Sequence, residues 1–153
     1  FLFCFICFNF FNKSYLGDGG SYLLSFIIGI FLIKFQSINN VSPYFIVLIL
    51  WYPAFENFFS IIRRILNKKK RADQPDLKHL HHLLYKYLKS KFKVKLLFSF
   101  SLPGIIINLF NFVIFIIGAN FIYSTSILIL LILICISVYL VCYFYLKKKI
   151  KII

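Results

Sequence analysis

Long apolar runs, separated by short polar or basic connectors, dominate the pattern of hydrophobic and polar positions along the chain. Each full run has close to the ~20 residues that a helix needs to cross about 30 Å of hydrocarbon. Helices are expected because every backbone N–H and C=O inside lipid must be hydrogen-bonded without water. The pattern predicts an all-α, polytopic integral membrane helix bundle, with a partial span at 1–11 and full spans near 20–38, 44–64, 96–117 and 122–146.

Two of these spans contain residues that bend helices. Pro53 lies inside the second full span and is expected to kink it, because proline removes a backbone hydrogen bond and crowds the preceding turn. Pro103 and Gly104 are expected to bend the third full span in the same way.

Composition agrees with a membrane protein. The 153 residues are 61% hydrophobic and 21% aromatic, more apolar surface than a soluble domain of this size can bury. The four cysteines lie inside apolar runs, so we expect reduced thiols that pack as small hydrophobes. The chain opens within an apolar run and contains no methionine, and we expect it to be the C-terminal part of a longer protein.

Charge predicts the orientation of the spans. Of the 18 Lys and Arg residues, 17 fall at Lys13, in the 63–95 stretch and in the 147–151 tail. Alternating the spans in and out places these three regions on one face, which the positive-inside rule assigns to the cytoplasm. Asp18 and all three histidines fall on that same face. The net charge of +14 is thus explained by basic residues that lie at the cytoplasmic membrane surface, and no nucleic-acid partner is expected.

The predicted cytoplasmic loop, 65–95, contains the sequence QPDLKHLHHLLYKYL. Asp76 is a suitable N-cap for a helix that begins at Leu77. At helical spacing, an apolar stripe is formed by Leu77, Leu80, Leu84 and Tyr87. A second face carries His79, His82 and Lys86, and a third carries His81 and Tyr85.

Three interpretations of the histidines remain open from the residues alone. Zinc-binding helices usually place histidines at i and i+4 beside a carboxylate, a spacing that HLHH does not have. A basic interfacial helix would bind anionic lipid headgroups through its lysines, and the loop by itself favours this interpretation. A pocket for a phosphorylated ligand would use imidazole donors at a helix N-terminus, together with nearby basic side chains such as Lys78.

Two positions in or near the spans carry unusual charges. Glu56 lies inside a span, where a carboxylate is costly; we expect a structural role, with a cationic partner such as Arg63 at i+7. Arg63 and Arg64 are typical membrane-end anchors and are also candidate phosphate contacts. Asp18, in SYLGDGGSYLL, lies between glycines that allow a tight turn into the next span, and it is also a candidate metal ligand.

Three stretches together resemble a known enzyme family. They are FNF…YLGDGGSYLL at 8–24, YPAFENFFSIIRR at 52–64 and QPDLKHLHHLLYKYL at 74–88, and they occur in this order. They are similar to the C-terminal half of the polyprenyl-phosphate N-acetylhexosamine-1-phosphate transferases, which are related to the phospho-MurNAc-pentapeptide translocases. The HLHH form, in place of three consecutive histidines, favours a simple amino-sugar donor.

The resemblance implies an enzyme of the bacterial inner membrane with a cytoplasmic active site. Such enzymes transfer an amino-sugar 1-phosphate, here GlcNAc-1-phosphate, from a UDP-sugar to undecaprenyl phosphate, with release of UMP, using Mg²⁺ or Mn²⁺. By resemblance, Asp18 is the metal-associated aspartate, Asn9 is a cleft asparagine, and the histidines act at the nucleotide-sugar end. The resemblance implies catalytic roles for Asp18, His79, His81 and His82 and a substrate-binding role for Asn9. The basic side chains of Arg63, Arg64 and Lys78 are further candidates for substrate binding.

Paired aspartate motifs that precede this region in the family are not in the sequence, so we expect the chain to be inactive alone. The main alternative is a non-catalytic membrane protein whose basic loop binds anionic lipid or a partner protein. A transporter for an anionic solute is a further alternative, although no repeated half is visible. A homo-oligomer is compatible with all three.

Overall fold

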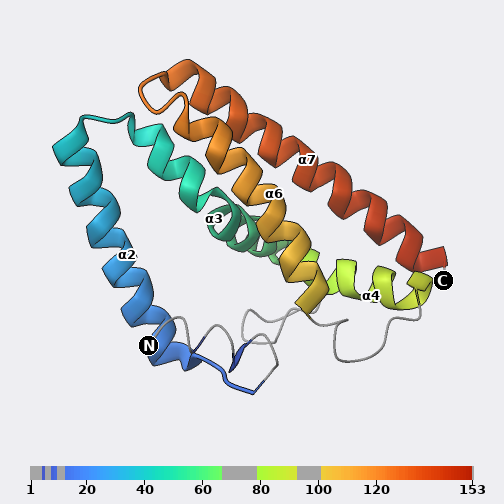
Figure 1. Ribbon diagram of the computed structural model, residues 1–153. Helices are drawn as coiled ribbons and strands as arrows, with labels where there is room; N and C mark the ends of the chain where they lie inside the picture. Colours follow the sequence, from blue (N-terminus) through green and yellow to red (C-terminus); the bar gives the residue numbers. More distant parts are fainter. Residues whose placement is uncertain (1–4, 6–7, 10–12, 67–78, 93–100, 153) are drawn as a thin grey trace. The chain divides into compact units, whose positions relative to one another are not determined.

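The computed structural model describes residues 5, 8–9, 13–66, 79–92 and 101–152, which are helical apart from short turns (Figure 1). In chain order the principal helices are α2 (Gly17–Asn39), α3 (Pro43–Leu66), α4 (Leu80–Phe92), α6 (Ser101–Ala119) and α7 (Thr125–Ile152). By length and composition, α2, α3, α6 and α7 could each cross a membrane. The predicted all-α membrane bundle is therefore confirmed. Most of the predicted partial span at 1–11 lies outside the described residues.

The chain forms two compact units, residues 1–42 and 43–153. In the first, α2 begins three residues earlier than predicted, and no residue of α2 is buried. The expected turn at Gly19 and Gly20 is wrong, because both glycines lie in the first turns of the helix. Gly17, the first residue of α2, instead has a φ of +68°, a conformation that glycine adopts without a steric penalty. Asp18 consequently belongs to the helix itself.

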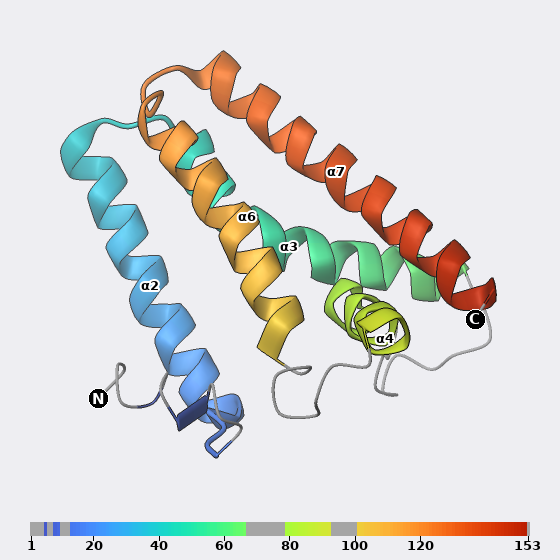
Figure 2. The same ribbon diagram turned by 45° about the vertical axis from the view of Figure 1, so that its right-hand side comes forward.

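In the second unit, α3 is bent. Pro53 lies inside this helix, and Figure 2 shows α3 changing direction behind α6 and continuing toward the C-terminal end of α7. The predicted kink is confirmed. Pro103 behaves differently, because it lies in the first turn of α6, where a backbone N–H has no helical partner to lose. The expected bend there is wrong, and α6 runs straight in Figures 1 and 2.

The core of this unit lies where α3, α6 and α7 meet. The hydrophobic effect does not drive helices together within lipid. Close packing and polar contacts between helices therefore contribute most to their association. Gly118 of α6 lies so close to α3 that an added Cβ would be 2.5 Å from a methyl group of the buried Leu48. Beside this contact, the buried Trp51 Nε1 donates a 3.0 Å hydrogen bond to Asn111 Oδ1 and links α3 to α6.

The short helix α4 packs on α6 and α7 and not only on a membrane surface. Its Leu80 and Leu83 are buried, and Leu84 and Tyr87 pack against the same core, so the predicted apolar stripe is largely confirmed. The predicted start of the helix is wrong, because α4 begins at Leu80 and not at Leu77. Residues 67–78, including the proposed cap and Lys78, lie outside the described residues.

Candidate functional site

The N-terminus of α4 is held by a carboxylate from another helix. Glu56 of α3 is 7% exposed, and its Oε1 accepts a 3.0 Å hydrogen bond from the backbone N–H of Leu80. The same oxygen lies 2.9 Å from Nδ1 of His79. The partner of Glu56 is thus a histidine, and the expectation of an arginine or lysine partner is replaced by this pair.

This arrangement explains why α4 begins where it does. The carbonyl of His79 accepts the first helical hydrogen bond, from the N–H of Leu83 at 3.1 Å, so His79 is the N-cap residue. The first N–H groups of a helix have no partner within it, and the helix dipole places partial positive charge at that end. The carboxylate of Glu56 satisfies one of these N–H groups and offsets that charge. It performs the role that the sequence suggested for Asp76.

The three imidazole rings form one cluster. The ring centroids of His81 and His82 are 4.2 Å apart, and those of His79 and His81 are 5.6 Å apart with the rings nearly parallel. Sequence spacing had separated these rings onto two helix faces. For His79 the separation fails because this residue precedes the first helical turn, so its ring does not follow helical spacing. His81 and His82 are neighbours within α4, and their rings lie together across the two faces.

Within this cluster, the electrostatic surroundings of His81 disfavour a positive charge. Desolvation lowers the pKa of His81 below its usual value, and the charges of His82 and His79 lower it further, against an opposing effect of Glu56. His81 is also an exposed residue of the cluster. The arrangement therefore offers neutral imidazole, which can both donate and accept a hydrogen bond.

The residues near Asp18 lie in the first unit. Asp18 is exposed in the first turn of α2, and Asn9 is exposed with its Nδ2 donating a 2.9 Å hydrogen bond to the carbonyl of Ser14. Over the ranges that the structure describes, no group of three His, Cys, Asp or Glu side chains could hold a metal ion. An exposed single carboxylate still fits Mg²⁺, which keeps several waters and binds through one or two carboxylates plus substrate oxygens.

The candidate phosphate contacts on α3 are half-buried. Arg63 donates a 2.9 Å hydrogen bond to Tyr143 Oη of α7, and its guanidinium lies over the rings of Phe59 and Tyr143. Arg63 therefore has a structural role in joining α3 to α7. Arg64 is also half-buried. In Figure 2 the ends of α3 and α7 approach α4, so basic residues from all three helices gather at one end of this unit, as the charge pattern predicted.

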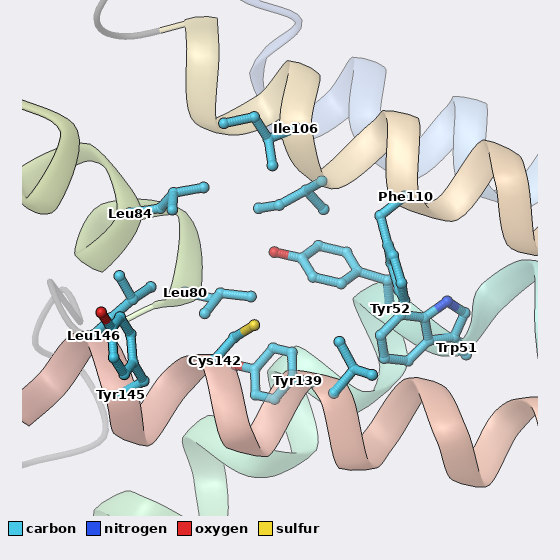
Figure 3. Close-up of a pocket in the computed structure, with 12 residues that line it drawn as sticks. Trp51, Tyr52, Leu80, Leu84, Ile106, Phe110, Tyr139, Cys142, Tyr145 and Leu146 are labelled. Atoms are coloured by element: carbon cyan, nitrogen blue, oxygen red, sulfur yellow. The ribbon is translucent and has the colours of Figure 1, made fainter.

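An apolar cavity of about 220 Å³ lies between α3, α4, α6 and α7. Figure 3 shows the Tyr52 ring crossing it, with the hydroxyl directed toward Leu80 and Leu84. Among the described side chains, three buried oxygens have no hydrogen-bond partner: Tyr52 Oη, Tyr139 Oη and Glu56 Oε2. Both hydroxyls interact electrostatically with the carboxylate of Glu56. Glu56 therefore lies at the centre of the polar interior. In the sequence, the only indication of this was the presence of a carboxylate inside a span.

Comparison with known proteins finds a distant relative. Over 103 residues, 63% of this chain, the sequence is 34% identical to a Bacillus subtilis (strain 168) protein named "probable undecaprenyl-phosphate N-acetylglucosaminyl 1-phosphate transferase". The chain spans 28% of the length of that protein. No protein-family model and no solved structure matches the chain. The chain is thus an all-helical sequence with several candidate membrane spans that is distantly similar to part of a glycosyl-1-phosphate transferase.

Proposed function

We propose that this chain belongs to an enzyme that transfers GlcNAc-1-phosphate from UDP-GlcNAc to undecaprenyl phosphate and releases UMP. The observation that carries the proposal is the 103-residue similarity to the Bacillus subtilis transferase. The reaction would take place at the cytoplasmic face of a bacterial inner membrane and begin a cell-envelope polysaccharide. Because the chain spans 28% of that relative, the activity is assigned to a longer protein that contains it.

The chemistry of this transfer suits the described residues. Two phosphate groups must approach each other, and their repulsion must be offset while charge develops on the transferred phosphoryl group. The clustered imidazoles of His79, His81 and His82 would donate hydrogen bonds to the diphosphate of the sugar nucleotide. Asp18 would hold Mg²⁺, or Mn²⁺, which when bound supplies positive charge to the phosphate oxygens.

The remaining proposed contacts are peripheral to this chemistry. Asn9 would hydrogen-bond the substrate from the first unit, and Lys78 and Arg64 would supply cationic contacts to its phosphates. Arg63 would add to that positive potential while it holds Tyr143 of α7. The buried anchoring of the histidine cluster favours this function over the alternative, a surface helix that binds anionic lipid through its lysines.

The test uses the full-length protein in membranes supplied with UDP-GlcNAc, undecaprenyl phosphate and Mg²⁺, with UMP release as the readout. Replacing His82 with Gln is expected to lower the rate of UMP release about 100-fold, because it removes a hydrogen-bond donor that stabilises the developing charge. Replacing the lysines at 68–70 with Ala is the matched control and is expected to change the rate less than threefold. The proposal is overturned if the wild type forms no lipid-linked sugar, or if only the lysine variant loses function and does so by losing binding to anionic liposomes.

A further inference from the structure

We propose that Glu56 is a positioning residue that holds a hydrogen of His79 on Nδ1 and thereby turns Nε2 toward the substrate, where the charged ring donates a hydrogen bond to a phosphate. The inference rests on the proposed function, in which the histidine cluster meets the diphosphate. The family resemblance gives Glu56 no such role. The pair of Glu56 and His79 is seen only in the structure, where α3 lies against the start of α4.

The first step is the direction of the hydrogen bonds at Glu56 Oε1. The N–H of Leu80 can only donate, so this oxygen already acts as an acceptor at 3.0 Å. A carboxylate oxygen in that role also accepts from His79, whose Nδ1 lies 2.9 Å away. Nδ1 must therefore carry a hydrogen. Nε2 is then the nitrogen available to a ligand: it donates to a phosphate oxygen in the charged ring and is an acceptor in the neutral ring.

The second step is accessibility. The side chain of Glu56 is 9% exposed and that of His79 is 22% exposed, so the ring lies between a buried carboxylate and the surface. One edge of the imidazole is held in the interior, and another part remains reachable. The same division occurs where a carboxylate orients a histidine that acts through its other nitrogen.

The third step concerns the alternatives available to the ring. Without Glu56, His79 would have neither a fixed tautomer nor a fixed orientation. The first N–H of α4 would also lose its acceptor. α4 packs mainly on α6 and α7, and Glu56 adds a specific polar link between α4 and the part of α3 that follows Pro53. A single carboxylate thus determines both where the histidine helix starts and how its first imidazole is turned.

A purely structural anchor would make a different prediction from a positioning residue. An anchor that acts only through the N–H of Leu80 would stabilise α4 whichever nitrogen of His79 carries the hydrogen. The critical measurement is therefore the tautomer of His79 in the ¹⁵N NMR spectrum of the full-length protein in membranes, without substrate. The signal is assigned by its loss in His79→Gln. We expect a hydrogen on Nδ1 in the wild type, and loss of this preference in Glu56→Leu.

Activity measurements add a readout that structural damage does not imitate. Glu56→Leu is expected to lower kcat at least tenfold, with KM for UDP-GlcNAc changed less than threefold, in the range seen when orienting partners are removed. Glu56→Gln keeps an acceptor of similar shape and is expected to recover part of the loss. In a His79→Gln background, Glu56→Leu is expected to cause no further loss of kcat, because the imidazole that Glu56 orients is already absent. Loss of the acceptor for the N–H of Leu80 is expected to lower stability instead.

Asn111→Leu is the matched control, because it breaks another buried hydrogen bond between helices and leaves α4 untouched. The inference is overturned if Asn111→Leu lowers kcat as much as Glu56→Leu, or if the two losses multiply in the His79→Gln background. A wild-type His79 with hydrogen on Nε2 alone overturns it without any variant, even if Glu56→Leu fails to fold. If the wild type makes no product, the proposed function fails, and the tautomer measurement still decides the role of Glu56.

Discussion

The two carboxylates Asp18 and Glu56 show how differently the two units of the chain are built. Asp18 lies exposed in the first turn of α2, a helix without a buried residue. Glu56 lies in the interior of the other unit and is held by the start of α4. A buried charge persists only when partners satisfy it, so Glu56 is explained by contacts within the chain. An exposed carboxylate needs no such partners, and Asp18 lies in the first turn of α2, where the helix dipole favours a negative charge.

The largest effect that tests this contrast is expected at Asp18. In the full-length protein, Asp18→Asn is expected to lower UMP release at least about 100-fold, because it removes a negative charge from the proposed Mg²⁺ site. The free energy of unfolding is expected to change by less than about 0.5 kcal/mol, as for other exposed positions. Asp18→Glu is the control that retains the carboxylate. Wild-type rates in Asp18→Asn would remove Asp18 from the proposed site.

Glycine substitutions test the difference in packing between the two units. An added Cβ at Gly29 of α2 would meet nothing within 4 Å, whereas at Gly118 of α6 it would meet Leu48 at 2.5 Å. Gly118→Ala is expected to lower the free energy of unfolding by about 1–3 kcal/mol through overpacking. Gly29→Ala is expected to raise it by up to about 1 kcal/mol, because alanine favours a helix interior.

The measurement for this pair is thermal or denaturant unfolding of the full-length protein in detergent, followed by circular dichroism. Equal destabilisation by both variants would contradict the comparison. It would mean that Gly29 lies in a tightly packed contact, and that α2 is covered in the longer protein.

Hydropathy predicted the four long helices because lipid imposes a length and an apolar composition on any span. The ends of α3, predicted at 44 and 64, lie at Pro43 and Leu66. The bend at Pro53 was equally predictable, because a proline in a helix interior has a local effect. These features depend on residues close together in the sequence, and sequence patterns report such residues well.

The start of α4 could not be predicted in this way. Its N–H acceptor is Glu56, which lies 24 residues before Leu80, and a search for local caps finds Asp76 instead. The wrong helix start also led to a wrong prediction for the histidines. It placed His79 inside the helix and so separated its ring from that of His81. A costly carboxylate inside a span was the available signal, and it indicated a buried partner without identifying it.

The smallest expected effect concerns His81, the exposed histidine of the cluster. Its lowered pKa means that the unfolded chain binds more protons than the folded one, so stability is expected to fall as pH drops from about 7.5 to 5.5. His81→Asn should weaken this loss, measured as the fall in the unfolding temperature across that range. The difference should be modest, because solvent screens an exposed ring. Parallel curves for the variant and the wild type would show that His81 does not contribute to the pH dependence, and that the cluster does not favour neutral His81.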